Sequence, residues 1–120
     1  MRLITSRICS WVFGGLLLSA LSPHAFAGDV ASYYGSESGT HTANGERFDP
    51  LGRTCAHRTY PFGTLLRVTY RGRTAVCRVN DRGPSHRLQP PRTLDVSLGI
   101  ARSLDLVAAG VGPVTIEVVP

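Results

Sequence analysis

Two polar clusters of the 120-residue chain carry side chains that can move a proton. The first spans residues 42–49, TANGERFD, and contains Glu46; the second spans residues 79–84, VNDRGP, and contains Asp81. Two carboxyl groups together with the imidazole of His57, which follows the first cluster, are residue types of general acid–base catalysis. Both clusters also contain turn formers, Asn-Gly and Gly-Pro, so they read equally well as two structural loops.

The elements that must position these clusters read as short strands separated by turn-rich loops. Apolar and polar residues alternate, or β-branched residues dominate, in five segments. We expect strands at residues 30–34, 65–70, 74–79, 93–96 and 114–119. One helix is expected at residues 98–108, capped by Ser97 and stopped by Gly110. A long loop with one helical turn is expected at residues 36–53. The pattern favours an all-β domain, a small closed barrel with one or two short helices.

The N-terminal segment has the pattern of a secretory signal peptide. A short basic region precedes the uncharged apolar stretch of residues 11–21, and Ala25-Phe26-Ala27 supplies a cleavage motif. We therefore expect a signal peptide at residues 1–27, a mature domain at residues 28–120, and export to the periplasm or cell envelope. An uncleaved N-terminal anchor is the alternative. Because Cys9 precedes the apolar stretch, we expect a soluble protein, without stable membrane insertion, and not a lipid-anchored one.

The charge of the chain comes from arginine alone. All 13 basic residues are arginine, against 8 acids, and the formal net charge is +5. This balance favours polyanions weakly, and an anionic cell-wall polymer is one candidate. Arginine runs with interleaved aromatic residues are absent from the sequence, so we expect no nucleic-acid partner. The histidines and acids lack metal-ligand spacing, so we expect neither a metal nor another cofactor. We also expect a monomer.

Two cysteines, Cys55 and Cys77, follow the predicted cleavage site. An even cysteine count in a small exported domain favours a disulfide. The closed loop would contribute roughly 3 kcal/mol to stability in the chain-entropy description. Two buried free thiols are the alternative.

Several motifs together resemble the rare lipoprotein A family. They follow in order through nearly the whole predicted mature chain: ASYYG at 31–35, TANGE at 42–46, His57, PFGT at 61–64, RVNDRGP at 78–84, LDVS at 94–97 and GPV at 112–114. The resemblance implies a six-stranded double-psi β-barrel. It also implies an endolytic peptidoglycan lytic transglycosylase, a lyase that acts on glycan strands poor in peptides.

The resemblance also assigns roles to individual residues. Asp81 is expected to be the essential acid, with Glu46 and His57 completing the catalytic site. Such an enzyme breaks the β-1,4 bond between N-acetylmuramic acid and N-acetylglucosamine and leaves a 1,6-anhydro end. The muramic C6 hydroxyl is then the nucleophile, so one carboxyl group can serve first as acid and later as base. Substrate contacts are expected from four residues of the motifs: Tyr34, Thr42, Asn44 and Arg82.

Other acids are weaker candidates, and two other functions compete. Asp49 and Asp95 are such candidates, and Asp95 precedes a helix start, where a structural role is expected. Tyr33 and Tyr34 alternate faces of a strand, so at most one can stack on a sugar. A non-catalytic, expansin-like wall-binding module is the main alternative to an enzyme. A glycan hydrolase is the second alternative, and it needs another carboxylate to activate water.

Overall fold

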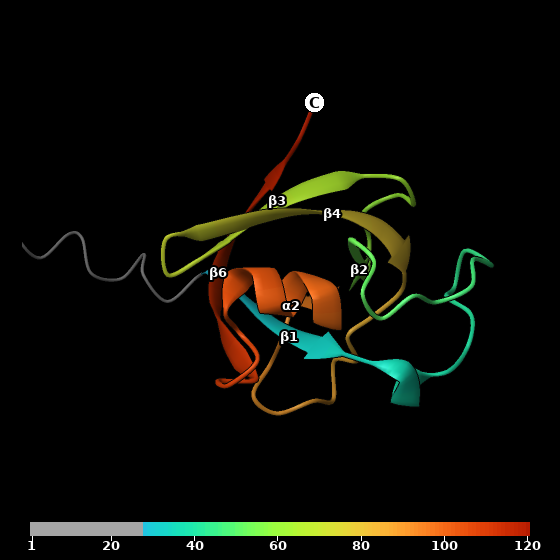
Figure 1. Ribbon diagram of the computed structural model, residues 1–120, viewed down its shortest axis with the longest axis horizontal. Coiled ribbons are helices and arrows are strands. Elements are labelled where there is room, and N and C mark those ends of the chain that lie inside the picture. Colours follow the sequence, from blue (N-terminus) through green and yellow to red (C-terminus); the bar gives the residue numbers. More distant parts are fainter. Residues whose placement is uncertain (1–27) are drawn as a thin grey trace, which may run out of the picture.

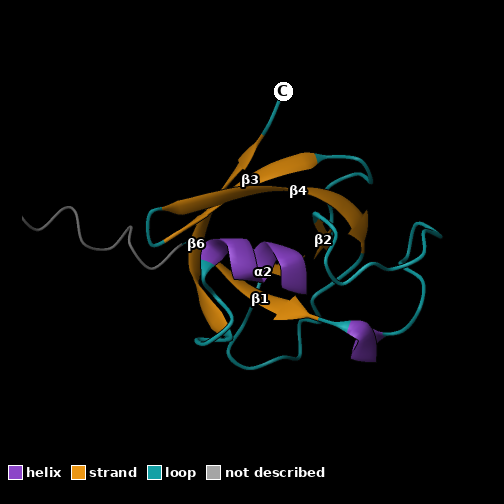
Figure 2. Cartoon of the chain, in the orientation of Figure 1, coloured by secondary structure: helices purple, strands orange, loops and turns teal. Residues whose placement is uncertain are grey.

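Six strands form a closed barrel in the computed structural model, which describes residues 28–120 (Figure 1). In chain order they are β1 (Asp29–Tyr34), β2 (Thr54–His57), β3 (Leu65–Tyr70), β4 (Arg73–Asp81), β5 (Leu94–Ser97) and β6 (Val111–Val118). Around the barrel the order is β1-β5-β2-β4-β3-β6, closed by antiparallel pairing of β6 with β1. Strands dominate and one α-helix is present in this part of the chain (Figure 2), which confirms the expected mainly-β barrel. The expected signal peptide lies outside the described residues.

Strand β2 is the element that the sequence did not predict. Its four residues carry no alternation, because Cys55 and Ala56 are both buried. It pairs in parallel with β4 and antiparallel with β5, so both edges are satisfied by strands distant in sequence. A segment this short is specified by its neighbours and has no period of its own.

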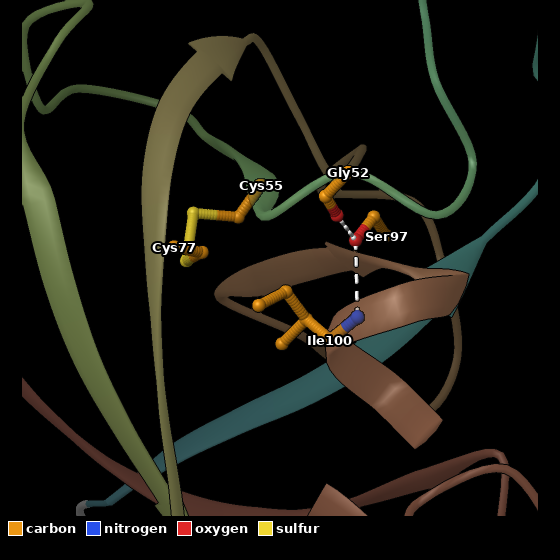
Figure 3. The surroundings of a disulfide bond; sticks show 5 residues. All are labelled: Gly52, Cys55, Cys77, Ser97 and Ile100. Carbon is orange, nitrogen blue, oxygen red and sulfur yellow. Dashed lines mark hydrogen bonds between the residues drawn. A yellow bond between two sulfur atoms is a disulfide. The ribbon is translucent and has the colours of Figure 1, made fainter. Parts of the chain in front are cut away.

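The interior of the barrel is filled by the alternate residues of the strands. Leu66 and Val68 of β3, with Val79 of β4, are fully buried in the main hydrophobic cluster. The predicted disulfide is confirmed within this core: Cys55 of β2 and Cys77 of β4 are bonded, with their Cα atoms 5.8 Å apart (Figure 3). The bond therefore joins the two strands that end in His57 and Asp81.

Helix α2 (Leu98–Leu104) packs against the core and is shorter than predicted. The capping role of Ser97 is confirmed, because its hydroxyl accepts from the Ile100 amide and also donates to the Gly52 carbonyl (Figure 3). The helix ends because Asp105 adopts the left-handed conformation, with φ of 60°. This turn buries Leu106, whereas the predicted helix-face residue Val107 is exposed.

A long loop, residues 35–53, connects β1 to β2 and extends to the right in Figure 1. Its single helical turn, η3 (Ser36–Ser38), matches the expected one. The end of the loop lies against α2, where the Gly99 amide donates to the Pro50 carbonyl at 2.8 Å. A side chain at Gly99 would bring a Cβ within 2.5 Å of the Leu51 carbonyl oxygen, so this approach requires glycine.

Two further features of residues 28–120 bear on function. The stretch contains no helix with the length and apolar character that crossing a bilayer requires. Nor does it contain a group of three or more histidine, cysteine or acidic side chains arranged to hold a metal ion.

Candidate active-site cleft

A bulge at the end of β4 determines where the carboxyl group of Asp81 points. Cys77 and Val79 point into the core, so strict alternation would send Asp81 inward as well. The register between β2 and β4 shifts instead: Cys55 pairs with Val79, but Ala56 pairs with Asp81. The extra residue, Asn80, therefore turns Asp81 to the outer face of the sheet. Bulges re-aim side chains in this way beside functional sites.

Four strands place a row of residues on that outer face. Ser32 of β1 pairs with Asp95 of β5, Asp95 pairs with Ala56 of β2, and Ala56 pairs with Asp81 of β4. Paired residues project to the same face of a sheet, so all four side chains point outward. The methyl side chain of Ala56 is the only one between the two aspartates. The two aspartates are far apart in the sequence, and only the register between strands brings them together.

The Asp81 carboxylate is surrounded by hydrogen-bond donors. Its Oδ1 accepts from the backbone amides of Ala43 and Arg82, each at 2.9 Å. Its Oδ2 accepts from the Tyr34 hydroxyl at 3.4 Å. These three donors hold the carboxylate in one orientation.

Asp95 lies in a different environment on the same face. Its only hydrogen bond within the described chain is from the Ser32 hydroxyl, at 3.1 Å to Oδ1. Burial raises the pKa of Asp95 to about 6, and the nearby charges of Asp81 and Glu37 add to the increase. The Ser32 hydrogen bond and the Arg92 charge oppose it. Two acids on one face with such different surroundings are typical of a proton donor and acceptor pair.

Both aspartates line a cleft of about 340 Å³. The cleft lies between the row on the sheet and the segments that follow β1 and β4. Its walls include Tyr34, Ser38, His41, Ala56, Arg82, Gly83, Pro84, Ser85 and Leu88. Most of these residues are polar or small.

Tyr34 supports the cleft and does not offer a face to a sugar. Its ring is only 7% exposed and is stacked on Phe48, with centroids 4.8 Å apart and planes 10° from parallel. Burial, followed by the charges of Asp81 and Asp95, raises the pKa of its hydroxyl above the ordinary value. Tyr34 thus remains a neutral donor to Asp81. Tyr33 faces the main core, which confirms that the two tyrosines lie on opposite faces.

Arg82 is placed at the cleft, as the sequence suggested. Its guanidinium lies over the ring of Phe62, 3.9 Å from the centroid, and donates to the His57 carbonyl at 3.2 Å. Phe62 is 42% exposed, so the pair forms a fixed, solvent-facing cation and ring beside Asp81.

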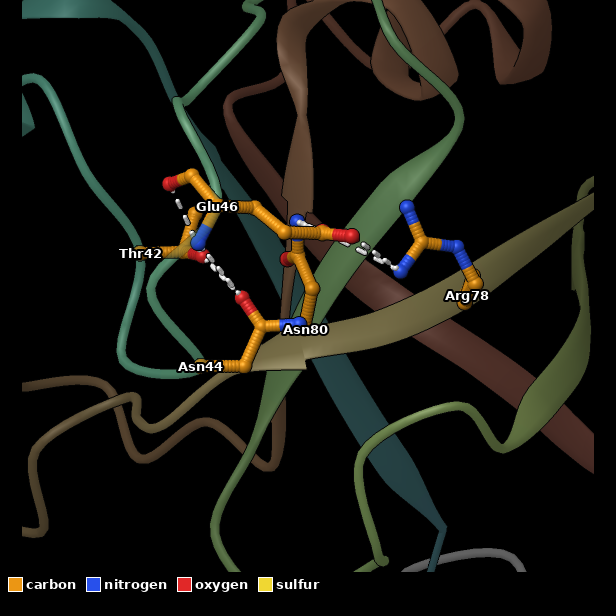
Figure 4. Close-up of polar contacts among 5 residues, drawn as sticks. All are labelled: Thr42, Asn44, Glu46, Arg78 and Asn80. Carbon is orange, nitrogen blue, oxygen red and sulfur yellow. Dashed lines mark hydrogen bonds and ion pairs between the residues drawn. The ribbon is translucent and has the colours of Figure 1, made fainter.

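Glu46 does not line the cleft of Asp81 but a separate groove. Its carboxylate accepts from Asn80 at 2.9 Å and from Arg78 at 3.1 Å, which lowers the pKa of Glu46. These contacts connect the loop to β4. Thr42 and Asn44 stabilise the turn that carries Glu46: the Thr42 hydroxyl donates to Asn44 Oδ1, which also accepts from the Glu46 amide (Figure 4). None of these three residues lines the cleft.

His57 also lies outside the cleft walls and makes no hydrogen bond to Asp81 in the described structure. Its Nδ1 accepts from the amides of Thr59 and Tyr60, at 3.1 and 3.2 Å. Burial, together with the charges of Arg58 and Arg82, lowers its pKa. The ring is therefore neutral at neutral pH, and Nε2–H is the tautomer that this network requires.

Comparisons with known proteins agree with this architecture. A family model described as lytic transglycolase matches residues 26–116. A protein of Nostoc sp. named "Probable endolytic peptidoglycan transglycosylase RlpA" is 50% identical over 94 residues, which cover 74% of this chain and 24% of that protein. The "Endolytic peptidoglycan transglycosylase RlpA" of Campylobacter jejuni is 41% identical over 96 residues, which cover 78% of this chain and 34% of that protein.

The chain thus spans about a quarter to a third of the length of these relatives. Among solved structures, the Streptomyces papain inhibitor has a similar fold, with a TM-score of 0.61 and 24% identity over 78% of this chain and 93% of its own.

Proposed function

Because the chain belongs to the rare lipoprotein A family of lytic transglycosylases, we propose that it is an endolytic peptidoglycan lytic transglycosylase. Its substrate would be the glycan strand, cut at the β-1,4 bond between N-acetylmuramic acid and N-acetylglucosamine. We propose strands poor in stem peptides as the preferred substrate, as the resemblance to the family implies. The names of the relatives support this substrate class.

The proposed reaction needs two proton transfers and no water. The bond from muramic C1 to the glucosamine O4 breaks, and O4 takes up a proton. The C6 hydroxyl oxygen of the same muramic residue bonds to C1, and its proton passes to a base. The summed mass of the two products therefore equals that of the substrate, whereas hydrolysis would add one water.

The observation that carries the proposal is the placement of Asp81. The β4 bulge turns its carboxylate out of the core and into a cleft, where two backbone amides hold it in one orientation. A fixed carboxylate of this kind can accept the C6 proton and stabilise positive charge at C1. Arg82 in the cleft wall, held over the Phe62 ring, supplies a cation for the glycan strand.

The other expected site residues would act indirectly in this proposal, without touching the glycan: Glu46, His57, Thr42 and Asn44. Glu46, Thr42 and Asn44 stabilise the loop whose Ala43 amide donates a hydrogen bond to Asp81. His57 would act through its carbonyl, which accepts from the Arg82 guanidinium. We further propose that residues 1–27 are a signal peptide that directs residues 28–120 to the cell envelope as a soluble domain.

Mass spectrometry of products tests the function. The mature domain is incubated with peptide-free glycan strands, alongside Asp81→Asn and, as a control, Asp105→Asn at the exposed end of α2. We expect 1,6-anhydromuramic ends from the parent and the control, and none from Asp81→Asn. Hydrolysed ends would instead identify the protein as a hydrolase. Intact strands that co-sediment with the protein would identify it as a binding module.

A further inference from the structure

We propose that Asp95 is the proton donor of this cleft and Asp81 the proton acceptor. The inference rests on the proposed function and names the two halves of its proton transfer. It divides between two carboxyl groups the work that sequence reasoning assigned to Asp81 alone, and it gives Asp95 a role in place of the expected structural one.

The barrel register brings the two groups to face each other. Asp95 and Asp81 are each paired with Ala56, from opposite sides, so their Cα atoms lie about 10 Å apart across one small residue. Each side chain extends a few ångströms from the sheet into the same cleft. A sugar chain bound in this cleft would pass both carboxyl groups, which line it together with the nearly buried Ala56.

The partners of Asp95 do not account for it as a structural residue. Within residues 28–120 it forms no salt bridge, and its one hydrogen bond, from Ser32, leaves the second carboxyl oxygen for the cleft. Structural carboxylates that are largely buried are ordinarily paired with a cation or with several donors. Asp81 accepts hydrogen bonds from two backbone amides and the Tyr34 hydroxyl, whereas Asp95 lacks such a set of donors.

The charged and titratable groups around Asp95 set which of the two acids keeps its proton. Asp81 on β4 and Glu37 on η3 bring negative charge toward it, whereas Arg92, before β5, brings positive charge. The Tyr34 hydroxyl of β1 is neutral, and His41 and Arg82 line the same cleft. Burial dominates this balance and favours the protonated acid, with a pKa of about 6.

The step balances without any added reactant. The Asp95 O–H gives its proton to the glucosamine O4 as the C1–O4 bond breaks. The muramic C6 oxygen bonds to C1, and the C6 hydroxyl proton passes to the Asp81 carboxylate. One acid has lost a proton and the other has gained one, so exchange with solvent restores both for the next turnover.

Asp95→Asn tests the assignment with a change of one atom. On glycan strands, we expect at least a 100-fold loss of anhydro product, since removing a general acid costs about 10²- to 10⁴-fold. Asp105→Asn, the same replacement outside the cleft, should keep parental activity. Co-sedimentation with strands and an unchanged circular dichroism spectrum would establish that Asp95→Asn is folded and still binds.

The outcomes separate the two proposals. An active parent with an inactive Asp95→Asn supports the proton donor. An active parent with an equally active Asp95→Asn overturns it and leaves the proposed function standing. A parent that forms no anhydro ends overturns the proposed function and the donor role with it.

The pH profile gives a second, independent readout. Above about pH 6 the fraction of protonated Asp95 falls about tenfold per pH unit, so cleavage should fall with it. Ser32→Ala removes a hydrogen bond that favours the ionised form, so it should move this alkaline limb to higher pH. A limb at the same pH in parent and Ser32→Ala would contradict the assignment, because a purely structural Asp95 gives no reason for a shift.

Discussion

Replacing Asp95 by asparagine should stabilise the domain at neutral pH while removing its activity. The pKa of Asp95 is raised from 3.8 to about 6, chiefly by burial. The folded state therefore holds this proton more tightly than the unfolded state does. Below about pH 4 both states are protonated and Asp95 costs nothing. As the pH rises toward 6 the unfolded chain releases the proton first, so the free energy of unfolding falls.

The size of the effect follows from the shift in pKa. A difference of about two pH units corresponds to about 3 kcal/mol, and partial exposure to the cleft reduces this to about 2 kcal/mol. Asparagine keeps an oxygen that can accept from Ser32, so the hydrogen bond survives the change. The variant should therefore match the parent at pH 4 and exceed its free energy of unfolding by about 2 kcal/mol at pH 7 and above.

Urea unfolding at pH 4, 5, 6, 7 and 8, with the disulfide intact, measures this difference. For a domain of this size, 2 kcal/mol moves the midpoint by about 1–2 M urea. Asp105→Asn serves as the control and should parallel the parent at every pH, because its carboxylate lies outside the cleft. A parent and an Asp95→Asn variant whose difference in stability is independent of pH would refute the reasoning.

Four further changes probe the scaffold and the cleft. Reduction of the Cys55–Cys77 bond, or its replacement by two alanines, should lower the free energy of unfolding by roughly 3 kcal/mol, measured by urea unfolding with and without reductant. Gly99→Ala should cost about 1–3 kcal/mol in the same assay, because its Cβ meets a loop carbonyl; parental stability would show that the loop yields freely. Tyr34→Phe removes one hydrogen bond to the Asp81 carboxylate and should reduce cleavage several-fold with binding unchanged. Glu46→Gln, outside the cleft, should keep more activity than any variant of the two aspartates. Full inactivation by Glu46→Gln would instead show that Glu46 takes part in the reaction.

The sequence predicted the elements with a strong local pattern. The β3–β4 hairpin follows from alternation on both sides of a tight turn, and the helix cap follows from Ser97. Strand β2 had no such signal, since its four residues are specified by two neighbours far away in the chain. The helix end was missed because a left-handed Asp105, not Gly110, ends it.

The candidate site was predicted in part for the same reason. The importance of Asp81 and Arg82 could be inferred from motif resemblance, and both lie in the cleft. Asp95 was passed over because its proximity to Asp81 arises from register across β5, β2 and β4. An acid between two buried residues, Leu94 and Val96, was a usable signal: it marks a carboxylate on the outer face of a core strand.

The strand order has a consequence for how the domain acquires its activity. Of the six adjacent pairs around the barrel, only β3 and β4 are consecutive in the chain; every other pairing closes a longer loop. Such a high contact order predicts slow folding that begins at this one hairpin. Strand β2 cannot take its place between β4 and β5 until β5 has been made and docked. An intermediate that lacks β5 or β2 therefore cannot hold both aspartates beside Ala56, and we expect the proposed activity only after the barrel has closed.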